Sequence, residues 1–245
     1  MEDVSLNRKY LWGYAEDTIH IAASPAGWGR REWFTAAAAV GTAAGLYYFD
    51  QNVKNWTVEN KNGTTQKLAD FGNHFGVGYN LLPGLGAFYL YGVAADDSRA
   101  KRAALLSVES FFIGGFFSTA VKYATHRQRP ADGDRYDNWD GPALRASDMS
   151  FCSGHATAAF SVMTVIATEY RDKPLVPPIA YGLALLTALS RIHDGAHWTS
   201  DAFVGSAIGY FTAKAIMSLH RKKTNFAVMP AVGGRHAGIS IIFSF

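Results

Sequence analysis

The hydrophobic positions of this chain fall into six predominantly apolar stretches, each of a length that predicts a helix rather than a strand. These stretches cover residues 33–49, 75–95, about 100–126, about 153–171, about 175–191 and about 197–220. Pro83 lies inside the second stretch and would kink a helix there, but the stretch is still too long for a strand. The sequence therefore predicts an all-α fold, a bundle of six helices.

Polar segments connect the predicted helices. Residues 50–74 form a long connection with an Asn-Gly turn and room for one short helix, and residues 131–150 form a long polar loop with several aspartates. The end of the chain, residues 225–245, alternates partly between polar and apolar positions, which predicts a short extended tail packed on the bundle. No segment has the length or polarity of a linker, so we interpret residues 1–245 as a single domain.

The charge and cysteine content narrow the classes of function. The net charge is +3, and the basic residues are scattered or local to three short clusters, so nucleic acid is not an expected partner. Cys152 is the only cysteine, which excludes an intrachain disulfide. The first 30 residues contain no continuous apolar run of the kind that a secretory signal needs.

The hydropathy of the chain favours a water-soluble or peripheral bundle. A helix that crosses a bilayer needs about 20 apolar residues. Glu109 and Lys214 interrupt two of the predicted helices, and the mean hydropathy of −0.02 is low for a protein with six spans.

The distribution of basic residues favours a membrane-spanning bundle instead, so both alternatives stay open. If successive helices alternate in direction and the three polar clusters share one face, the opposite face receives most of the remaining cations. These are Arg30, Arg31, Arg99, Lys101, Arg102, Arg171, Lys173 and residues 221–223. Such a bias is typical of cytoplasmic loops. It would place the clusters on the extracytoplasmic, periplasmic side of a membrane.

The three clusters contain most of the candidate chemistry. The first is KYATHRQRP, residues 122–130, and it includes the cations Lys122 and Arg129. The second is SFCSGH, residues 150–155, and the third is SRIHDGAHWTSD, residues 190–201. Each cluster lies at the boundary of a predicted helix.

These residue types suit the transfer of a phosphoryl group. Fixed cations such as Lys122, Arg129 and Arg191 can stabilise charge on the phosphoryl oxygens without a metal. The second cluster begins a helix at Ser153 and Gly154, where free backbone N–H groups and the helix dipole favour an anion.

His197 and Asp201 are four residues apart, so the carboxylate can accept a hydrogen bond from one ring nitrogen and leave the other free to attack phosphorus. Taken singly, these residues also fit a helix cap or a solvated side chain. The pair of His193 and His197 suggests zinc, but Gly195 between them indicates a turn and no acidic ligand is placed nearby. The acidic loop fails the calcium pattern because Tyr136 stands where the third oxygen ligand belongs. We therefore expect neither a metal nor a cofactor.

Together the clusters read Lys-x6-Arg-Pro, Ser-Gly-His and Ser-Arg-x5-His-x3-Asp, in this order. This three-part pattern resembles the signature of the type 2 phosphatidic acid phosphatase family, which is related to vanadium haloperoxidases and bacterial class A acid phosphatases. The resemblance covers about residues 100–215, which we interpret as the catalytic core, and the six-helix layout is similar to the membrane members of that family.

The resemblance implies a role for each residue of the pattern. It makes His197 the nucleophile that forms a phosphohistidine, Asp201 its orienting partner and His155 the acid that protonates the leaving oxygen. It also implies that the phosphoryl oxygens are bound by Lys122, Arg129, Ser153, Gly154 and Arg191. Cys152 departs from the family, which usually has Pro before Ser-Gly-His, so the loop backbone is less constrained.

The expected function is that of a metal-independent phosphatase acting on a lipid phosphate or pyrophosphate, with a phosphorylated lipid and a membrane as its partners. One alternative is a vanadate-dependent haloperoxidase, because vanadate would be held by the same cations and by His197. Another is a non-catalytic membrane or envelope protein, against which the intact His155, His197 and Asp201 argue. The sequence leaves the particular lipid and the oligomeric state open.

Overall fold

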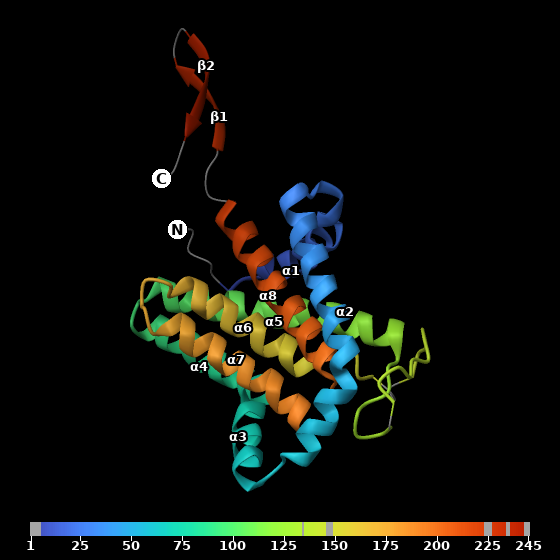
Figure 1. The fold of residues 1–245 in the computed structure, drawn as a ribbon. Coiled ribbons are helices and arrows are strands. Elements are labelled where there is room, and N and C mark those ends of the chain that lie inside the picture. The colour runs from blue at the N-terminus through green and yellow to red at the C-terminus, as the bar shows by residue number, and fades with distance from the viewer. Residues whose placement is uncertain (1–5, 134, 146–148, 223–226, 234–235, 243–245) are drawn as a thin grey trace.

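The computed structural model describes residues 6–133, 135–145, 149–222, 227–233 and 236–242, with the side chains described as far as residue 221. Over these residues the chain forms eight α-helices, two short 3-10 helices and one hairpin (Figure 1). The α-helices are α1 (Arg8–Ala23), α2 (Arg30–Glu59), α3 (Gly63–Asn73), α4 (Gly78–Ala94), α5 (Ser98–Thr125), α6 (Gly154–Glu169), α7 (Val176–His193) and α8 (Thr199–Lys222). The 3-10 helices are η1 (Ser24–Gly27) and η2 (His74–Gly76).

The predicted all-α class is confirmed, but the predicted number of six helices is too low. Each of the six apolar stretches is a helix, and α3 is the short helix for which the polar connection had room. The Asn62 side chain caps α3 by accepting from the N–H groups of Thr64 and Thr65. The helix α1 was not predicted, because charged residues interrupt its apolar positions and Asp17 is its buried residue.

The helix α6 lies at the centre of the bundle and packs against α5, α7 and α8. Small residues let α8 approach α6 closely. A Cβ atom added at Gly205 would lie 2.3 Å from the Ser153 carbonyl oxygen, and one added at Gly209 would lie 2.3 Å from that of Thr157. Any larger side chain would push α8 away from the start of α6, where the second cluster lies.

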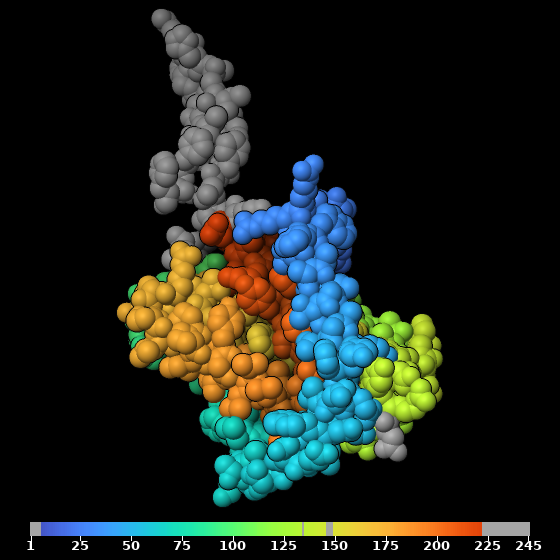
Figure 2. Space-filling model, viewed as in Figure 1, coloured from blue at the N-terminus to red at the C-terminus, as the bar shows by residue number. Residues whose placement is uncertain are grey.

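The helix α2 runs along one side of the bundle against α7 and α8. In Figure 2 it crosses the surface between the orange residues of α7 and the yellow-green loop that follows α5. One side of α2 therefore faces α7, where the third cluster begins, and its other side faces the loop after α5, where the first cluster ends.

The end of the chain forms an antiparallel hairpin of β1 (Ala227–Gly233) and β2 (His236–Ile242), in which Ala227 pairs with Ile242. The sequence predicted one extended segment, and the structure has two strands. The predicted packing of this tail on the bundle, and residues 243–245, lie outside what the structure describes.

Candidate active site

The predicted site residues gather at one end of the bundle. They come from the end of α5, the start of α6, the end of α7 and the start of α8, which alternate in direction. A Cβ atom added at Gly154 would lie 3.9 Å from Lys122 Cε, and the Ser153 N–H donates to the Asp201 carbonyl at 3.0 Å. The three clusters therefore meet, as their positions at helix boundaries require.

The first cluster follows the end of α5. Its last turn contains Lys122, whose Nζ donates to the Met149 carbonyl at 2.6 Å. His126 ends the helix in a left-handed conformation, with φ of 42°, and its buried ring is held by the Gly141 and Arg145 carbonyls at 3.1 and 2.9 Å. This turn leads the chain out of the helix, so Arg129 lies in the loop beyond it.

The second cluster begins α6. Ser153 is buried and is the N-cap, and its Oγ accepts from the Ala156 N–H at 3.4 Å. Cys152 is buried beside Ser118, with 3.4 Å between Sγ and Oγ, so the departure from proline leaves the helix start intact. The free N–H groups of the first turn and the Lys122 side chain could together bind an anion.

Arg191 lies in the last turn of α7 and is braced by a neighbouring helix. Its Nη1 donates to Asn73 Oδ1 at 2.7 Å, and Asn73 in turn donates to Asp194 Oδ2 at 2.7 Å. Among the described residues, the buried Arg191 Nε has no hydrogen-bond partner. The guanidinium is thus fixed on one side and keeps a donor, Nε–H, from which a phosphoryl oxygen could accept.

Replacing Arg191 or Arg129 by Lys keeps the charge but removes the planar fork, so we expect each variant to lose roughly tenfold or more of the phosphatase activity. At position 191 a single ammonium cannot serve both Asn73 and a phosphoryl oxygen in the same geometry. The exposed Arg135, paired with Asp137 at 2.7 Å, supplies a matched control in Arg135→Lys, which should keep the wild-type rate. Wild-type rates in both site variants would show that these arginines do not bind phosphate.

His197 is buried, and its hydrogen bond determines which ring nitrogen is reactive. Nδ1 lies 2.7 Å from the Ser150 carbonyl oxygen. Because a carbonyl oxygen only accepts, Nδ1 bears the proton and Nε2 has the lone pair. Asp201 Oδ2 lies 3.9 Å from Nδ1, which is too long for a hydrogen bond. The direct contact with Asp201 that the spacing predicts is therefore replaced by one with a backbone carbonyl.

The electrostatic surroundings keep both histidines neutral in the free protein. Burial lowers the pKa of His197 well below its usual value, and the charges of Lys122, Arg129 and Arg191 lower it further. Burial and the same three cations lower the pKa of His155 to about 4. An anion bound among these cations would oppose their effect on both rings.

Asp201 binds a residue that the sequence analysis did not select. Arg127 Nη1 donates to Asp201 Oδ1 at 2.6 Å, while Oδ2 accepts from the Trp198 N–H at 3.0 Å and from the Ser150 hydroxyl. Arg127 is fully buried, but in the sequence it is one of six residues between Lys122 and Arg129 and resembles a solvated cation. Its burial depends on contacts that no local pattern contains.

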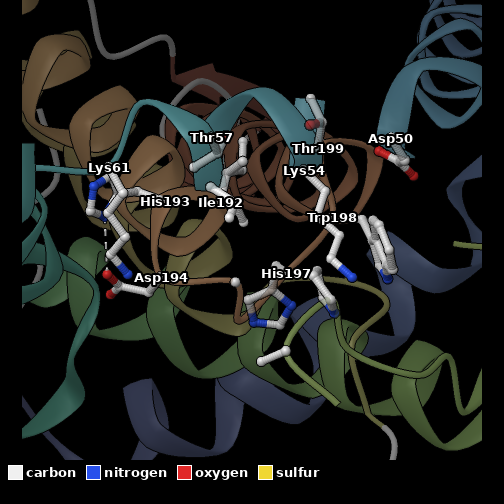
Figure 3. Close-up of a pocket in the computed structure, with 14 residues that line it drawn as sticks. Asp50, Lys54, Thr57, Lys61, Ile192, His193, Asp194, His197, Trp198 and Thr199 are labelled. Carbon is white, nitrogen blue, oxygen red and sulfur yellow. Dashed lines mark hydrogen bonds and ion pairs between the residues drawn. The ribbon is translucent and has the colours of Figure 1, made fainter. Parts of the chain in front are cut away.

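A pocket of about 200 Å³ lies between α2 and the segment that carries His197 (Figure 3). Its lining includes Asp50 and Lys54 from α2 and Lys61 from the turn that follows α2. In Figure 3, Lys54 extends from α2 toward His197 and Trp198, and its Nζ donates to the Gly133 carbonyl at 2.7 Å. The pocket shows that α2 forms one wall of the site.

The residues considered for metal binding have other contacts. His193 Nε2 lies 3.0 Å from Thr65 Oγ1, and its Nδ1 lies 3.4 Å from Asp194 Oδ1. In the acidic loop, Asp137 pairs with Arg135 and Asp140 with Arg145. Over the part of the chain that the structure describes, the group of three possible metal ligands is a different one, Asp17, Glu109 and His220.

The bundle brings three cations, the N-terminus of α6 and a neutral histidine to one end, an arrangement that suits a phosphoric ester hydrolase. The comparisons with known proteins agree. Residues 103–225 match the family model of the PAP2 superfamily, and the chain belongs to this family. The resemblance to type 2 phosphatidic acid phosphatases is thereby confirmed.

Relatives and solved structures show what the chain is similar to. It is 32% identical over 146 residues to decaprenylphosphoryl-5-phosphoribose phosphatase of Mycobacterium tuberculosis, covering 60% of this chain and 73% of that protein. It is 35% identical over 98 residues to lipid A 1-phosphatase of Porphyromonas gingivalis, covering 40% and 19%. The fold matches the transmembrane PAP2 type phosphatidylglycerolphosphate phosphatase of Bacillus subtilis with a TM-score of 0.60 and 19% identity, over 76% of this chain and 96% of the other.

Proposed function

We propose that the protein hydrolyses a phosphate or pyrophosphate group on a lipid through a phosphohistidine formed on His197. One observation carries this proposal: the His197 Nδ1–H donates to the Ser150 carbonyl and leaves the Nε2 lone pair free beside three cations. A neutral, oriented imidazole next to a phosphate-binding site is an activated nucleophile.

In the first step the phosphoryl oxygens bind the cations and the free N–H groups at the start of α6. His197 Nε2 attacks phosphorus, the N–P bond forms and the bond from phosphorus to the leaving oxygen breaks. His155, which takes up a proton from solvent when the phosphate binds, gives that proton to the leaving oxygen. In the second step neutral His155 takes a proton from water, the water oxygen bonds to phosphorus and the N–P bond breaks. Phosphate leaves, His155 releases its proton to solvent, and both histidines are neutral again.

An apolar groove beside the site supports a lipid substrate. It has a volume of about 530 Å³ and is lined by α2, α7 and α8, with side chains such as Leu46, Leu189 and Phe203. Ile192 and Thr199 line both this groove and the pocket beside His197, so the groove adjoins the site. A hydrocarbon chain there would place its phosphate at the cations. The names of the relatives, which include lipid phosphatases, support the same substrate class.

The exposed apolar surface supports a bundle that lies in a membrane. Within the described residues, α5 and α8 are long and apolar enough to cross one. Large apolar side chains are also exposed on the other helices. They include Trp33, Phe34, Val40, Tyr48, Phe49 and Trp56 of α2, Tyr79 and Leu90 of α4, and Ile179, Leu185 and Leu189 of α7.

The charges at the helix ends support an extracytoplasmic, periplasmic active site. The site lies at the start of α8, whereas Arg221 lies about 30 Å away near its end. Arg99 and Arg102 lie at the start of α5, also far from the site. They pair with Asp172 and Glu169, but the positive-inside rule counts Lys and Arg rather than net charge.

The test is phosphate release from a panel of lipid phosphates in detergent, in the presence of a strong chelator. We expect release because fixed cations take the place of a divalent ion, and we expect vanadate to inhibit as a mimic of the transition state. The panel contains phosphatidate, phosphatidylglycerol phosphate, a polyprenyl pyrophosphate and lipid A, with His197→Ala as the blank. Activity that is lost in chelator and restored by magnesium or zinc would contradict the mechanism. Halide oxidation with added vanadate, without phosphate release, would favour the haloperoxidase.

A further inference from the structure

Arg127 is a fully buried cation at which α2, α8 and the loop after α5 meet. Its Nε and Nη2 donate to the Tyr136 carbonyl at 3.0 and 2.7 Å. Nη2 also donates to Asp50 at 2.7 Å, and Nη1 donates to Ser200 at 2.8 Å and to Asp201 at 2.6 Å. An uncompensated charge would be costly at this depth, so these contacts fix the guanidinium in one position.

Aromatic rings enclose the same guanidinium. Its Cζ lies 4.8 Å from the ring centre of Trp139, 4.9 Å from that of Tyr47 and 5.2 Å from that of Trp198. Rings at these distances attract a cation and exclude water from it. Water therefore screens the ion pairs of Arg127 less than it screens ion pairs at the surface.

Asp50 supplies the second carboxylate of the network. It is buried in α2 and accepts from the Ser200 N–H at 2.9 Å, from the Ser200 hydroxyl and from Arg127. The residues that match the PAP2 family model are 103–225, so Asp50 comes from a helix outside the matched region. It is 150 residues from Ser200 in the sequence.

The network continues to His197 through Asp201 and Ser150. Asp201 receives Arg127 on Oδ1, and its Oδ2 receives the Ser150 hydroxyl and the Trp198 N–H. The Ser150 carbonyl then accepts from His197 Nδ1. Asp201 is thus held by its other partners, and its distance of 3.9 Å from Nδ1 follows from them.

We propose that Arg127 and Asp50 are positioning residues for the nucleophile. Together with Ser150 and Trp198, Arg127 fixes Asp201 and neutralises its charge, so that a neutral carbonyl rather than a carboxylate orients His197. Asp50 holds Arg127 in place. This inference rests on the proposed role of His197. A carboxylate bonded to Nδ1 would make the imidazole more basic, whereas a carbonyl leaves it neutral down to lower pH.

The two residues have opposite charges, so their removal has opposite effects. Arg127→Gln removes a positive charge and leaves the negative charge of Asp201 uncompensated near Nδ1, which raises the pH at which His197 becomes protonated. Asp50→Asn removes a negative charge and leaves Arg127 paired with Asp201, which lowers that pH. The other charged or titratable groups around His197 are the same in both variants. They are Lys122 of α5, Arg129, His155 of α6, Arg191 of α7, Asp201 of α8 and Lys54 of α2.

The experiment measures kcat/KM against pH with nitrophenyl phosphate, because this ratio reports ionisations of the free enzyme and the substrate's own ionisation is common to all variants. We expect the midpoint of the acid limb to rise by about one pH unit in Arg127→Gln and to fall in Asp50→Asn. Rapid quench supplies a second measurement. A more basic His197 is a poorer leaving group, so the phosphorylated fraction at steady state should rise in Arg127→Gln.

Arg102→Gln is the matched control, because it breaks another buried ion pair, with Glu169 at 2.9 Å, at the far end of the bundle. It should destabilise the protein without moving the midpoint. Midpoints that stay at the wild-type value, or that move in the same direction in both site variants, would overturn the inference. If Arg127→Gln does not fold, the test rests on Asp50→Asn alone. A midpoint that does not fall in that variant would overturn the inference. Wild-type protein without a phosphoenzyme would instead refute the proposed function, and this inference with it.

Discussion

His197→Ala is expected to abolish turnover of every phosphate ester, with a loss of roughly 10⁴-fold or more in kcat. Alanine offers no nitrogen to phosphorus, so the covalent intermediate cannot form whatever the leaving group. The loss should be the same for a lipid phosphate and for nitrophenyl phosphate, measured as released phosphate on protein whose folded state has been checked by thermal unfolding.

His193→Ala is the matched control for this result. His193 lies four residues earlier and lines the same pocket, but its ring contacts Thr65 and Asp194 rather than the Ser150 carbonyl. We expect it to keep most of the activity. If the two histidines together held a metal, both variants would lose activity alike, and that outcome would contradict the assignment of His197.

His155→Ala is expected to give the second large effect, and one that depends on the substrate. A general acid assists a poor leaving group, typically by about 10²–10⁴-fold. A lipid alkoxide needs the proton, whereas nitrophenolate leaves with little help. The variant should therefore lose far more of the phosphorylation rate with the lipid than with the nitrophenyl ester. The comparison is made by rapid quench on the first step, because in the proposed mechanism His155 also serves as the base in the second step.

The pH dependence of this step follows from the pKa of His155. In the free protein that pKa is lowered to about 4, so the ring is neutral at pH 7. A bound phosphate raises it by opposing the three cations. Because the acid must be protonated, the lipid phosphorylation rate should fall as pH rises through the pKa of the complex, and it should fall less steeply with the nitrophenyl ester. Equal losses in His155→Ala for both substrates would show that His155 is not the acid.

The helices that form the core could be predicted because their apolar stretches are long. The apolar pattern that predicts a helix was weaker where a helix contains buried polar residues. Asp17 of α1 is buried near His220 of α8, with 3.3 Å between the carboxylate and the ring, so polar contacts help to hold α1, alongside Ile21, which packs against the core. Only the tertiary contact shows why this segment becomes a helix.

That the residues of the three-part pattern come together could be predicted because each lies at a helix end. The contacts among them could not. The spacing of His197 and Asp201 makes a hydrogen bond feasible, but the carboxylate is bound by Arg127, which is itself held by Asp50 from a distant helix. The sequence spacing shows which side chains are close enough to form a hydrogen bond. Which hydrogen bonds form depends on the other buried donors and acceptors that compete for the same atoms.

The central claim is that a phosphoryl group is transferred to His197, and trapping the intermediate tests it most directly. Wild-type protein is mixed with a phosphate ester and quenched in alkali within milliseconds, because phosphohistidine survives base and is lost in acid. Peptide mass spectrometry then locates the added group. Phosphate on His197 in the wild-type protein, and its absence from His197→Ala, is the predicted result. Turnover without any phosphorylated histidine, or a phosphoenzyme that still forms in His197→Ala, would contradict it.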